Sequence, residues 1–118
     1  KYIKIELDMD QAIEIIKNKN EDWVEIEYIP ISKKLQIELD HLRWGSYDFI
    51  FYREIYYDKN PDKEYTVEEE EIEYQKSCIL KEQHDILGLE LAKKIKTELP
   101  TWEIVYVNVT DCKEIIIE

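Results

Sequence analysis

Glycine is scarce in this sequence: Gly45 and Gly88 are the only two among 118 residues. Loops that cradle phosphate groups depend on several glycines, because the backbone has to approach the phosphate closely. Two isolated glycines cannot form such a loop. The sequence therefore predicts no nucleotide-binding site of this kind.

Cysteine and histidine are also scarce, limited to Cys78, Cys112, His41 and His84. Their spacing matches no zinc site, and neither cysteine lies in a catalytic signature or beside a basic cluster that would lower the pKa of its thiol. A domain of this length does not need a disulfide, so the two distant cysteines indicate reduced thiols in a cytoplasmic protein; the alternative is a secreted protein with one disulfide bridge. We expect no catalytic residues, no metal and no cofactor.

Positive charge is in short supply, with 16 Lys and Arg against 28 Asp and Glu and a net charge of −12. Such a chain repels phosphate backbones and anionic lipid and attracts basic surfaces. No run of residues approaches the ~18 apolar residues of a transmembrane helix, and residues 1–4 alternate in polarity, unlike the core of a signal peptide. We expect a cytoplasmic protein that binds neither nucleic acid directly nor membrane.

Apolar residues are plentiful, since 44% of the chain is hydrophobic and 12% aromatic. That content is enough to build a core in a chain whose length is typical of one domain. We expect a single domain over residues 1–118. Its predicted class is α+β, with one mainly antiparallel sheet of about five to six strands and two to three helices packed on it.

The period of the hydrophobic residues predicts the order of the elements. Alternation of apolar and polar residues predicts strands over residues 3–7, 24–28 and 35–39. Asp8 or Asp10 can cap a helix that carries Ala12, Ile13 and Ile16 inward. After a turn at residues 44–46, residues 47–57 are apolar or aromatic on both faces, which is typical of a central strand. A turn follows at residues 60–62.

The second half of the sequence is predicted to hold the main helix. Thr66 and Glu69 match a capping box, which favours a helix over residues 66–82, although the same residues also suit a strand. Helical spacing is clear over residues 85–99, where Pro100 ends the pattern. Two strands, over residues 102–109 and 115–117, should then pair antiparallel, because their connection is too short to cross over.

The densest acidic stretch is the candidate site for a partner. It contains six glutamates within ten residues and no Lys or Arg, and tyrosines lie close to it in the sequence. Carboxylates can meet a basic surface, and tyrosines make good interface anchors because they offer a wide contact area with a hydrogen-bonding hydroxyl. The predicted partner-binding residues are Glu64, Glu68, Glu69, Glu70, Glu71, Glu73, Tyr57, Tyr65 and Tyr74.

Four functions are compatible with these features. The first is an acidic, non-enzymatic binding protein that neutralises a basic protein partner, as an immunity protein against a bacterial nuclease-type toxin would. A phage-encoded inhibitor of a nucleic-acid-binding enzyme acts by the same chemistry. The third is a regulatory subunit of a complex, and the fourth is a small enzyme that acts through carboxylates assisted by His41 or His84.

Overall fold

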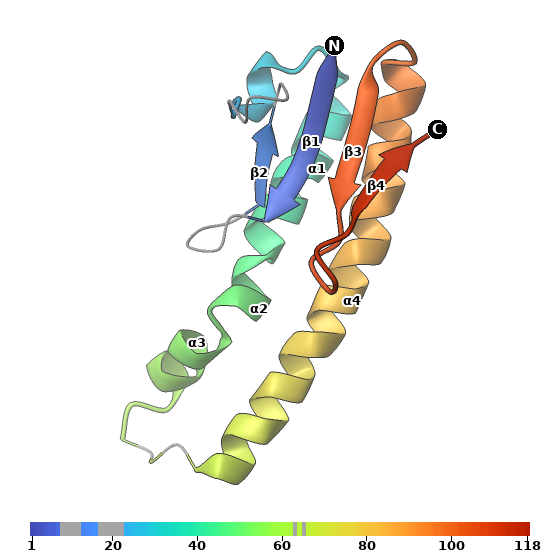
Figure 1. The fold of residues 1–118 in the computed structure, drawn as a ribbon. Coiled ribbons are helices and arrows are strands. Elements are labelled where there is room, and N and C mark those ends of the chain that lie inside the picture. Colours follow the sequence, from blue (N-terminus) through green and yellow to red (C-terminus); the bar gives the residue numbers. More distant parts are fainter. Residues whose placement is uncertain (8–12, 17–22, 63, 65) are drawn as a thin grey trace.

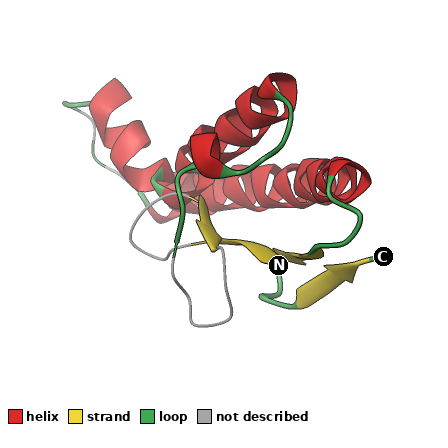
Figure 2. Ribbon diagram, turned by 90° about the horizontal axis from the view of Figure 1, so that it is seen from above, coloured by secondary structure: helices red, strands yellow, loops and turns green. Residues whose placement is uncertain are grey.

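A four-stranded sheet with helices on one face makes up the fold in the computed structural model, which describes residues 1–7, 13–16, 23–62, 64 and 66–118 (Figure 1). Seen from above, the helices form one layer over the strands (Figure 2). The strands are β1 (Tyr2–Leu7), β2 (Ile13–Ile16), β3 (Glu103–Val107) and β4 (Glu114–Ile117), and the helices are η1 (Ile26–Tyr28), α1 (Lys33–Gly45), α2 (Tyr47–Ile50), α3 (Tyr52–Lys59) and α4 (Val67–Glu98). The predicted α+β class is confirmed.

The sheet is mixed, in the order β2-β1-β3-β4. β1 and β3 pair in parallel at the centre, with Ile3 opposite Ile104 and Ile5 opposite Tyr106. β2 and β4 each add an antiparallel edge strand. The prediction of a mainly antiparallel sheet of five to six strands was therefore wrong in detail. Helices connect β1 to β3 across the sheet, and a long connection of this kind is what parallel neighbours require.

Strand β2 replaces part of the helix that was predicted to follow Asp8 or Asp10. Its residue Ile15 pairs with Ile5 in an antiparallel ladder. Isoleucine is β-branched, so it loses side-chain freedom in a helix and packs well on a pleated sheet. The start of the predicted helix, including Ala12, lies outside the described residues.

Helix α1 replaces one of the predicted strands. Leu35, Ile37 and Leu39 alternate as in a strand, but Leu35, Leu39 and Leu42 also lie about one helical turn apart. Those three leucines are buried, whereas Ile37 is exposed. Ser32 caps the helix, because its Oγ accepts a hydrogen bond from the Leu35 N–H at 3.3 Å. A short apolar run fits either period, and the cap and burial identify the helix.

The strand predicted over residues 24–28 is absent from the part of the chain that the structure describes. The Val24 N–H donates to the Ile15 carbonyl at 2.9 Å, and the chain then turns into η1. Pro30 follows shortly afterwards. Because proline has no N–H to donate, a ladder could not continue through this segment.

Residues 47–57, predicted to be the central strand, form α2 and most of α3. The rings of Trp44 and Tyr47 stack with centroids 5.3 Å apart, and those of Tyr47 and Phe51 stack at 5.2 Å. Side chains three or four residues apart meet on the surface of a helix. Aromatic residues also suit strands, so composition alone led to the wrong element.

One long helix, α4, takes up both segments predicted as helical, residues 66–82 and 85–99. It begins where the capping pattern predicted, since the Thr66 Oγ1 accepts a hydrogen bond from the Glu69 N–H at 3.2 Å. It ends shortly before Pro100. The strand alternative for the first segment is excluded, and the two closing strands pair antiparallel as predicted.

The buried carboxylate of Asp85 ties α4 to the turn between β3 and β4. Its Oδ1 accepts hydrogen bonds from the Tyr106 hydroxyl and the Val109 N–H, each at 2.8 Å. Its Oδ2 accepts from the Thr110 hydroxyl at 2.8 Å and the Thr110 N–H at 3.2 Å. Burial and the bond to Asp85 raise the pKa of Tyr106 far above its ordinary value, so that hydroxyl stays a neutral donor.

The core lies between the sheet and the helices α1 and α4. The residues that fill it include Ile3, Ile5, Ile15, Leu35, Leu39, Leu42, Phe49, Leu91, Ala92, Ile95, Ile104, Tyr106 and Ile117. Only the second half of α4 contributes, because the sheet ends beside the middle of this helix (Figure 1).

The first half of α4 runs past the sheet, with α3 beside it, as a projection that we call the helical arm (α3 and residues 67–83) (Figure 1). The molecule measures 52 × 26 × 24 Å, and its radius of gyration is 16.0 Å. A compact domain of this length would have a radius of gyration of about 13.5 Å. The arm accounts for the elongated shape and carries most of the predicted partner-binding residues.

Candidate functional site

The helical arm brings most of the predicted partner-binding residues together. Glu68 and Glu71 are exposed on α4, and Glu64 is exposed just before it. Tyr57 on α3 and Tyr74 on α4 also expose about half of their surface. Tyr65 lies outside the described residues. The described members of this set lie on or next to the helical arm, at one end of the molecule (Figure 1).

Three glutamates of the arm form polar contacts with other side chains of the same chain. Glu70 forms an ion pair with Arg53 of α3, and the Glu69 carboxylate accepts a hydrogen bond from the Tyr56 hydroxyl. Glu73 lies 3.3 Å from the Lys76 ammonium, one turn along α4. The first two contacts hold α3 against α4.

The sequence did not predict these partners, because its apolar and aromatic pattern indicated a strand over residues 47–57. Arg53 and Tyr56 are three residues apart, so in a helix their side chains lie on the same face. A helix over residues 52–59, joined by a short connection to a second helix that begins after the capping box at Thr66, would have predicted this pairing, because two such helices run antiparallel.

Negative charge remains on the arm after these contacts are counted. Residues 52–83 contain ten Asp and Glu against five Lys and Arg, which is a net charge of −5. No ion pair of Glu64, Glu68 or Glu71 is present among the residues that the structure describes. Glu71 accepts one hydrogen bond, from the neutral Gln75 amide at 3.1 Å. These three carboxylates are exposed to solvent.

Tyr74 lies beside Cys78, one turn along the same helix. The hydrogen bond with the Cys78 thiol raises the pKa of the Tyr74 hydroxyl. The hydroxyl therefore keeps its proton at neutral pH and can donate a hydrogen bond from an exposed position. An exposed, neutral tyrosine next to carboxylates suits a protein contact.

A hollow of about 260 Å³ lies between parts of α3 and α4 on the arm. Its lining carries both signs of charge, because Lys59 and Lys76 lie there with Asp48 and Glu73. Tyr52 and Tyr56 form part of its wall. A mixed lining of this kind suits side chains of a protein partner better than a small ion of one charge.

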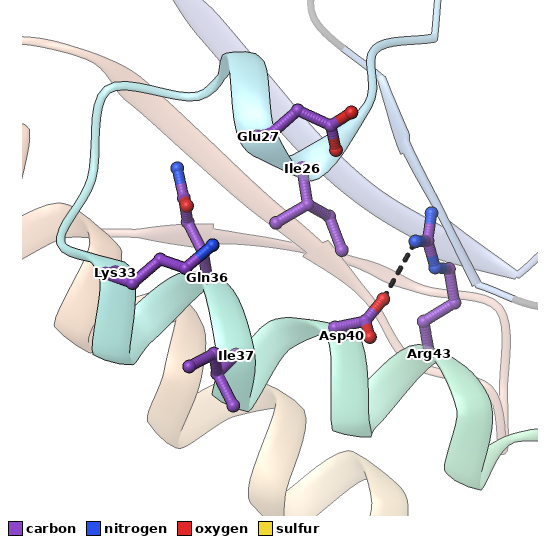
Figure 3. Close-up of a pocket in the computed structure, with 7 residues that line it drawn as sticks. All are labelled: Ile26, Glu27, Lys33, Gln36, Ile37, Asp40 and Arg43. Carbon is purple, nitrogen blue, oxygen red and sulfur yellow. Dashed lines mark hydrogen bonds and ion pairs between the residues drawn. The ribbon is translucent and has the colours of Figure 1, made fainter.

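A second hollow, of about 220 Å³, lies where α1 meets η1 (Figure 3). Lys33, Gln36 and Ile37 border it on α1, and Ile26 and Glu27 border it on η1. The Gln36 amide donates to the Ile29 carbonyl at 3.1 Å, so part of its polar lining is already satisfied.

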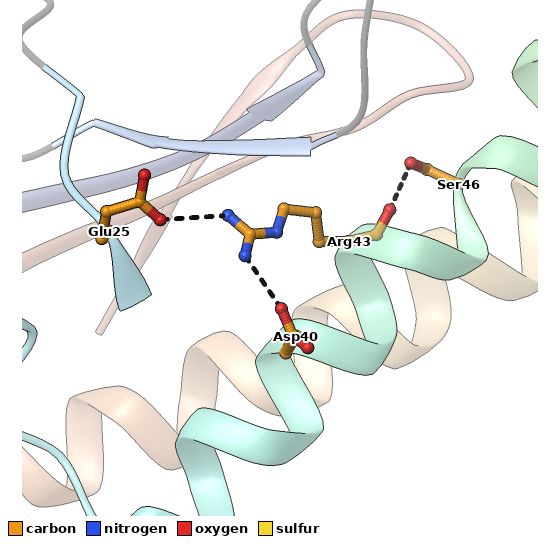
Figure 4. Close-up of polar contacts among 4 residues, drawn as sticks. All are labelled: Glu25, Asp40, Arg43 and Ser46. Carbon is orange, nitrogen blue, oxygen red and sulfur yellow. Dashed lines mark hydrogen bonds and ion pairs between the residues drawn. The ribbon is translucent and has the colours of Figure 1, made fainter. Parts of the chain in front are cut away.

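Arg43 also lines this second hollow (Figure 3), and its polar contacts are drawn in Figure 4. Its guanidinium donates to Asp40 at 2.8 Å and lies 4.0 Å from Glu25, which links α1 to the segment before η1. The Arg43 carbonyl accepts a hydrogen bond from the Ser46 hydroxyl at 2.6 Å. The arginine is thus engaged in holding the fold together.

The two histidines lie apart from the hollows described above. His41 is exposed on α1. His84 on α4 is only 7% exposed, and its ring meets the Phe49 ring edge to face, with the ring centroids 5.1 Å apart. Cys78 and Cys112 are free thiols. In residues 1–7, 13–16, 23–62, 64 and 66–118, no group of three or more His, Cys, Asp or Glu is placed to hold a metal ion.

Acidification should destabilise the protein through His84. Burial lowers the pKa of His84 to about 4 in the folded chain, whereas an unfolded histidine titrates near 6.5. Between these values the unfolded chain binds the proton that the folded chain excludes, so stability is complete above about pH 6.5 and falls toward pH 4. We expect the free energy of unfolding, measured with urea, to drop by about 2 kcal/mol between about pH 7 and pH 5.

Two variants isolate this effect. In His84→Phe the ring contact with Phe49 is kept without a titrating group, so the loss between the two pH values should disappear. In His41→Asn the loss should persist, because that histidine is exposed. An equal loss in His84→Phe and in the native chain would show that another group is responsible.

No helix in the described part of the chain combines the length and the apolar character needed to cross a membrane. Comparison of this chain with protein-family models, curated proteins and solved structures gives no match.

Proposed function

We propose that this chain is an acidic, non-enzymatic binding protein that uses its helical arm to cover a basic surface of a protein partner. The observation that carries the proposal is the projecting arm. Residues 52–83, which form the arm and the connection between its helices, have a net charge of −5, and Glu64, Glu68 and Glu71 have no internal ion pair among the described residues. Carboxylates on a projection reach a partner without desolvating the rest of the molecule. They also speed its encounter with a positive surface.

The tyrosines support the contact at short range. Tyr57 and Tyr74 are exposed beside the carboxylates, and their rings can bury apolar area against a partner while the hydroxyls hydrogen-bond. Long-range charge gives association rate and orientation, whereas buried aromatic anchors give most of the affinity. The arm offers the two kinds of group together.

The partner that we propose is a nuclease-type bacterial toxin, which makes this chain its immunity protein. An enzyme built to hold a phosphate backbone presents Lys and Arg around its active site, and the acidic arm is complementary to such a surface. Covering it would exclude the nucleic acid. Such neutralisation takes place in the cytoplasm of the producing cell, and two unpaired thiols support a reducing compartment.

The test is binding and inhibition of basic nuclease toxin domains, taken first from reading frames next to the gene of this chain. Calorimetry should give an affinity that falls steeply between about 50 and 300 mM salt, because screening weakens charge complementarity. Nuclease activity should fall in proportion to the complex formed. Glu68→Lys combined with Glu71→Lys should weaken binding by about ten-fold or more at low salt.

A matched control separates the arm from overall charge. Glu27→Lys combined with Glu118→Lys makes the same change in net charge at exposed positions away from the arm, and it should leave the affinity nearly unchanged. Circular dichroism should show that the two double variants keep their helix content. Equal weakening by the two pairs, or complexes that form without any salt dependence, would overturn the proposal.

A further inference from the structure

Helix α4 carries a second apolar face that nothing in the described structure covers. Ile72, Ile79 and Ile86 are 55%, 54% and 66% exposed, and Leu80 and Leu87 are exposed beside them. We call these five residues the outer stripe. Large apolar side chains that gather on one surface mark an interaction site more often than isolated ones do.

The outer stripe lies on the side of α4 that faces away from the core. Its members recur every seven residues, which returns a side chain to nearly the same face of a helix. The buried residues of α4 follow another line, through Ser77, His84 and Leu91. A surface helix that packs on one core needs only one apolar face, so the second face has no packing role within the described part of the chain.

Four members of the stripe are symmetric about Gln83. Ile79 and Leu80 lie four and three residues before it, and Ile86 and Leu87 lie three and four residues after it. The polar residues on the same face are symmetric in position and opposite in charge, with Lys76 seven residues before Gln83 and Glu90 seven residues after it. A surface with this arrangement is complementary to its own reverse.

We infer that the outer stripe binds a second copy of this chain, with the two α4 helices antiparallel and crossing at Gln83. Each Ile79 then lies opposite Leu87 of the second copy, each Leu80 opposite Ile86, and each Lys76 opposite Glu90. A two-fold axis at Gln83 makes the contact the same on each chain, as in most homodimers. The apolar residues leave water, Lys76 gains a second carboxylate in addition to Glu73 of its own chain, and Glu90 gains a cation.

Charge decides the direction of the helices. In a parallel pair each Lys76 would face Lys76 and each Glu90 would face Glu90, and like charges in register are destabilising. The antiparallel pair replaces both repulsions with attractions. Glu90 is exposed and Lys76 has a side chain 65% exposed, so both can reach across to the second chain.

This dimer leaves the two tyrosine anchors of the proposed function outside the contact, whereas Glu68 lies one turn before Ile72 on the face of the outer stripe. Tyr74 is two residues past Ile72, which turns it by about 160° around the axis of α4, away from the outer stripe. Tyr57 is on α3. The dimer contact therefore leaves these anchors accessible, and either proposal can fail without the other.

Charge-swap variants test the dimer and its direction. Analytical ultracentrifugation at about 1 to 100 µM should show that the 14.4 kDa chain sediments as a dimer. Lys76→Glu alone and Glu90→Lys alone should each weaken dimerisation by about ten-fold or more, because each places two pairs of like charges in contact. Mixing the two variants should restore a dimer, since a heterodimer has only opposite charges in contact.

Lys81→Glu is the matched control. It reverses a charge on the same helix, on a side away from the stripe, and should leave the dimer intact. A native chain that stays monomeric at about 100 µM would overturn the inference. Single variants that dimerise as strongly as the native chain, or a mixture no stronger than either variant alone, would overturn the antiparallel arrangement.

Discussion

Replacing Asp85 with alanine should lower the free energy of unfolding by about 3 to 5 kcal/mol. The side chain is 8% exposed and accepts four hydrogen bonds, so its removal leaves the Tyr106 hydroxyl and the Val109 N–H buried without an acceptor. Thr110 loses its contact with α4 as well. Urea denaturation followed by circular dichroism measures the loss.

Milder and exposed substitutions give this prediction its controls. Tyr106→Phe removes one of the four bonds and should cost about 1 kcal/mol, which keeps the test informative if Asp85→Ala does not fold. Asp58→Ala, at an exposed position on α3, should change stability by less than about 0.5 kcal/mol. A loss below about 1 kcal/mol in Asp85→Ala would mean that Asp85 does not hold α4 to the β3–β4 turn.

Replacing Gly88 with alanine should also destabilise the protein, by about 1 to 3 kcal/mol, although alanine is the better helix former by about 1 kcal/mol. A Cβ at this position would lie 2.6 Å from the Tyr106 hydroxyl oxygen. That ring is fully buried, and its hydroxyl is bonded to Asp85. The ring therefore cannot move aside without breaking the bond or separating α4 from β3.

Gly45 is the matched control, because it is the other glycine of the sequence and also lies in a helix. No atom lies within 4 Å of a Cβ at this position. Gly45→Ala should therefore gain up to about 1 kcal/mol from helix propensity. Thermal and urea unfolding of the two variants give the comparison, and a gain in stability for Gly88→Ala would contradict a close approach of α4 to Tyr106.

The candidate site was predictable in its position and not in its detail. A dense run of glutamates after a capping residue predicts a helix whose carboxylates share one end of the molecule. Which glutamates keep their charge free depended on Arg53 and Tyr56, which reach them only because α3 folds back along α4. The outer stripe was missed for a similar reason, since the seven-residue spacing of its isoleucines has meaning only once α4 is known to be continuous through Glu82 and Asp85.

Local chemistry in the sequence was enough to determine the acidic character of the chain, the α+β class, the cap at Thr66, the helix that ends before Pro100 and the strands that enclose the last turn. These features depend on neighbouring residues alone. Tertiary packing decided the rest, because a short apolar run satisfies a helix or a strand until burial selects which of its side chains face the core. Packing also placed β1 beside β3, and it made Asp85 and Gly88 structural residues through Tyr106, a partner too distant in sequence for any local pattern to reveal.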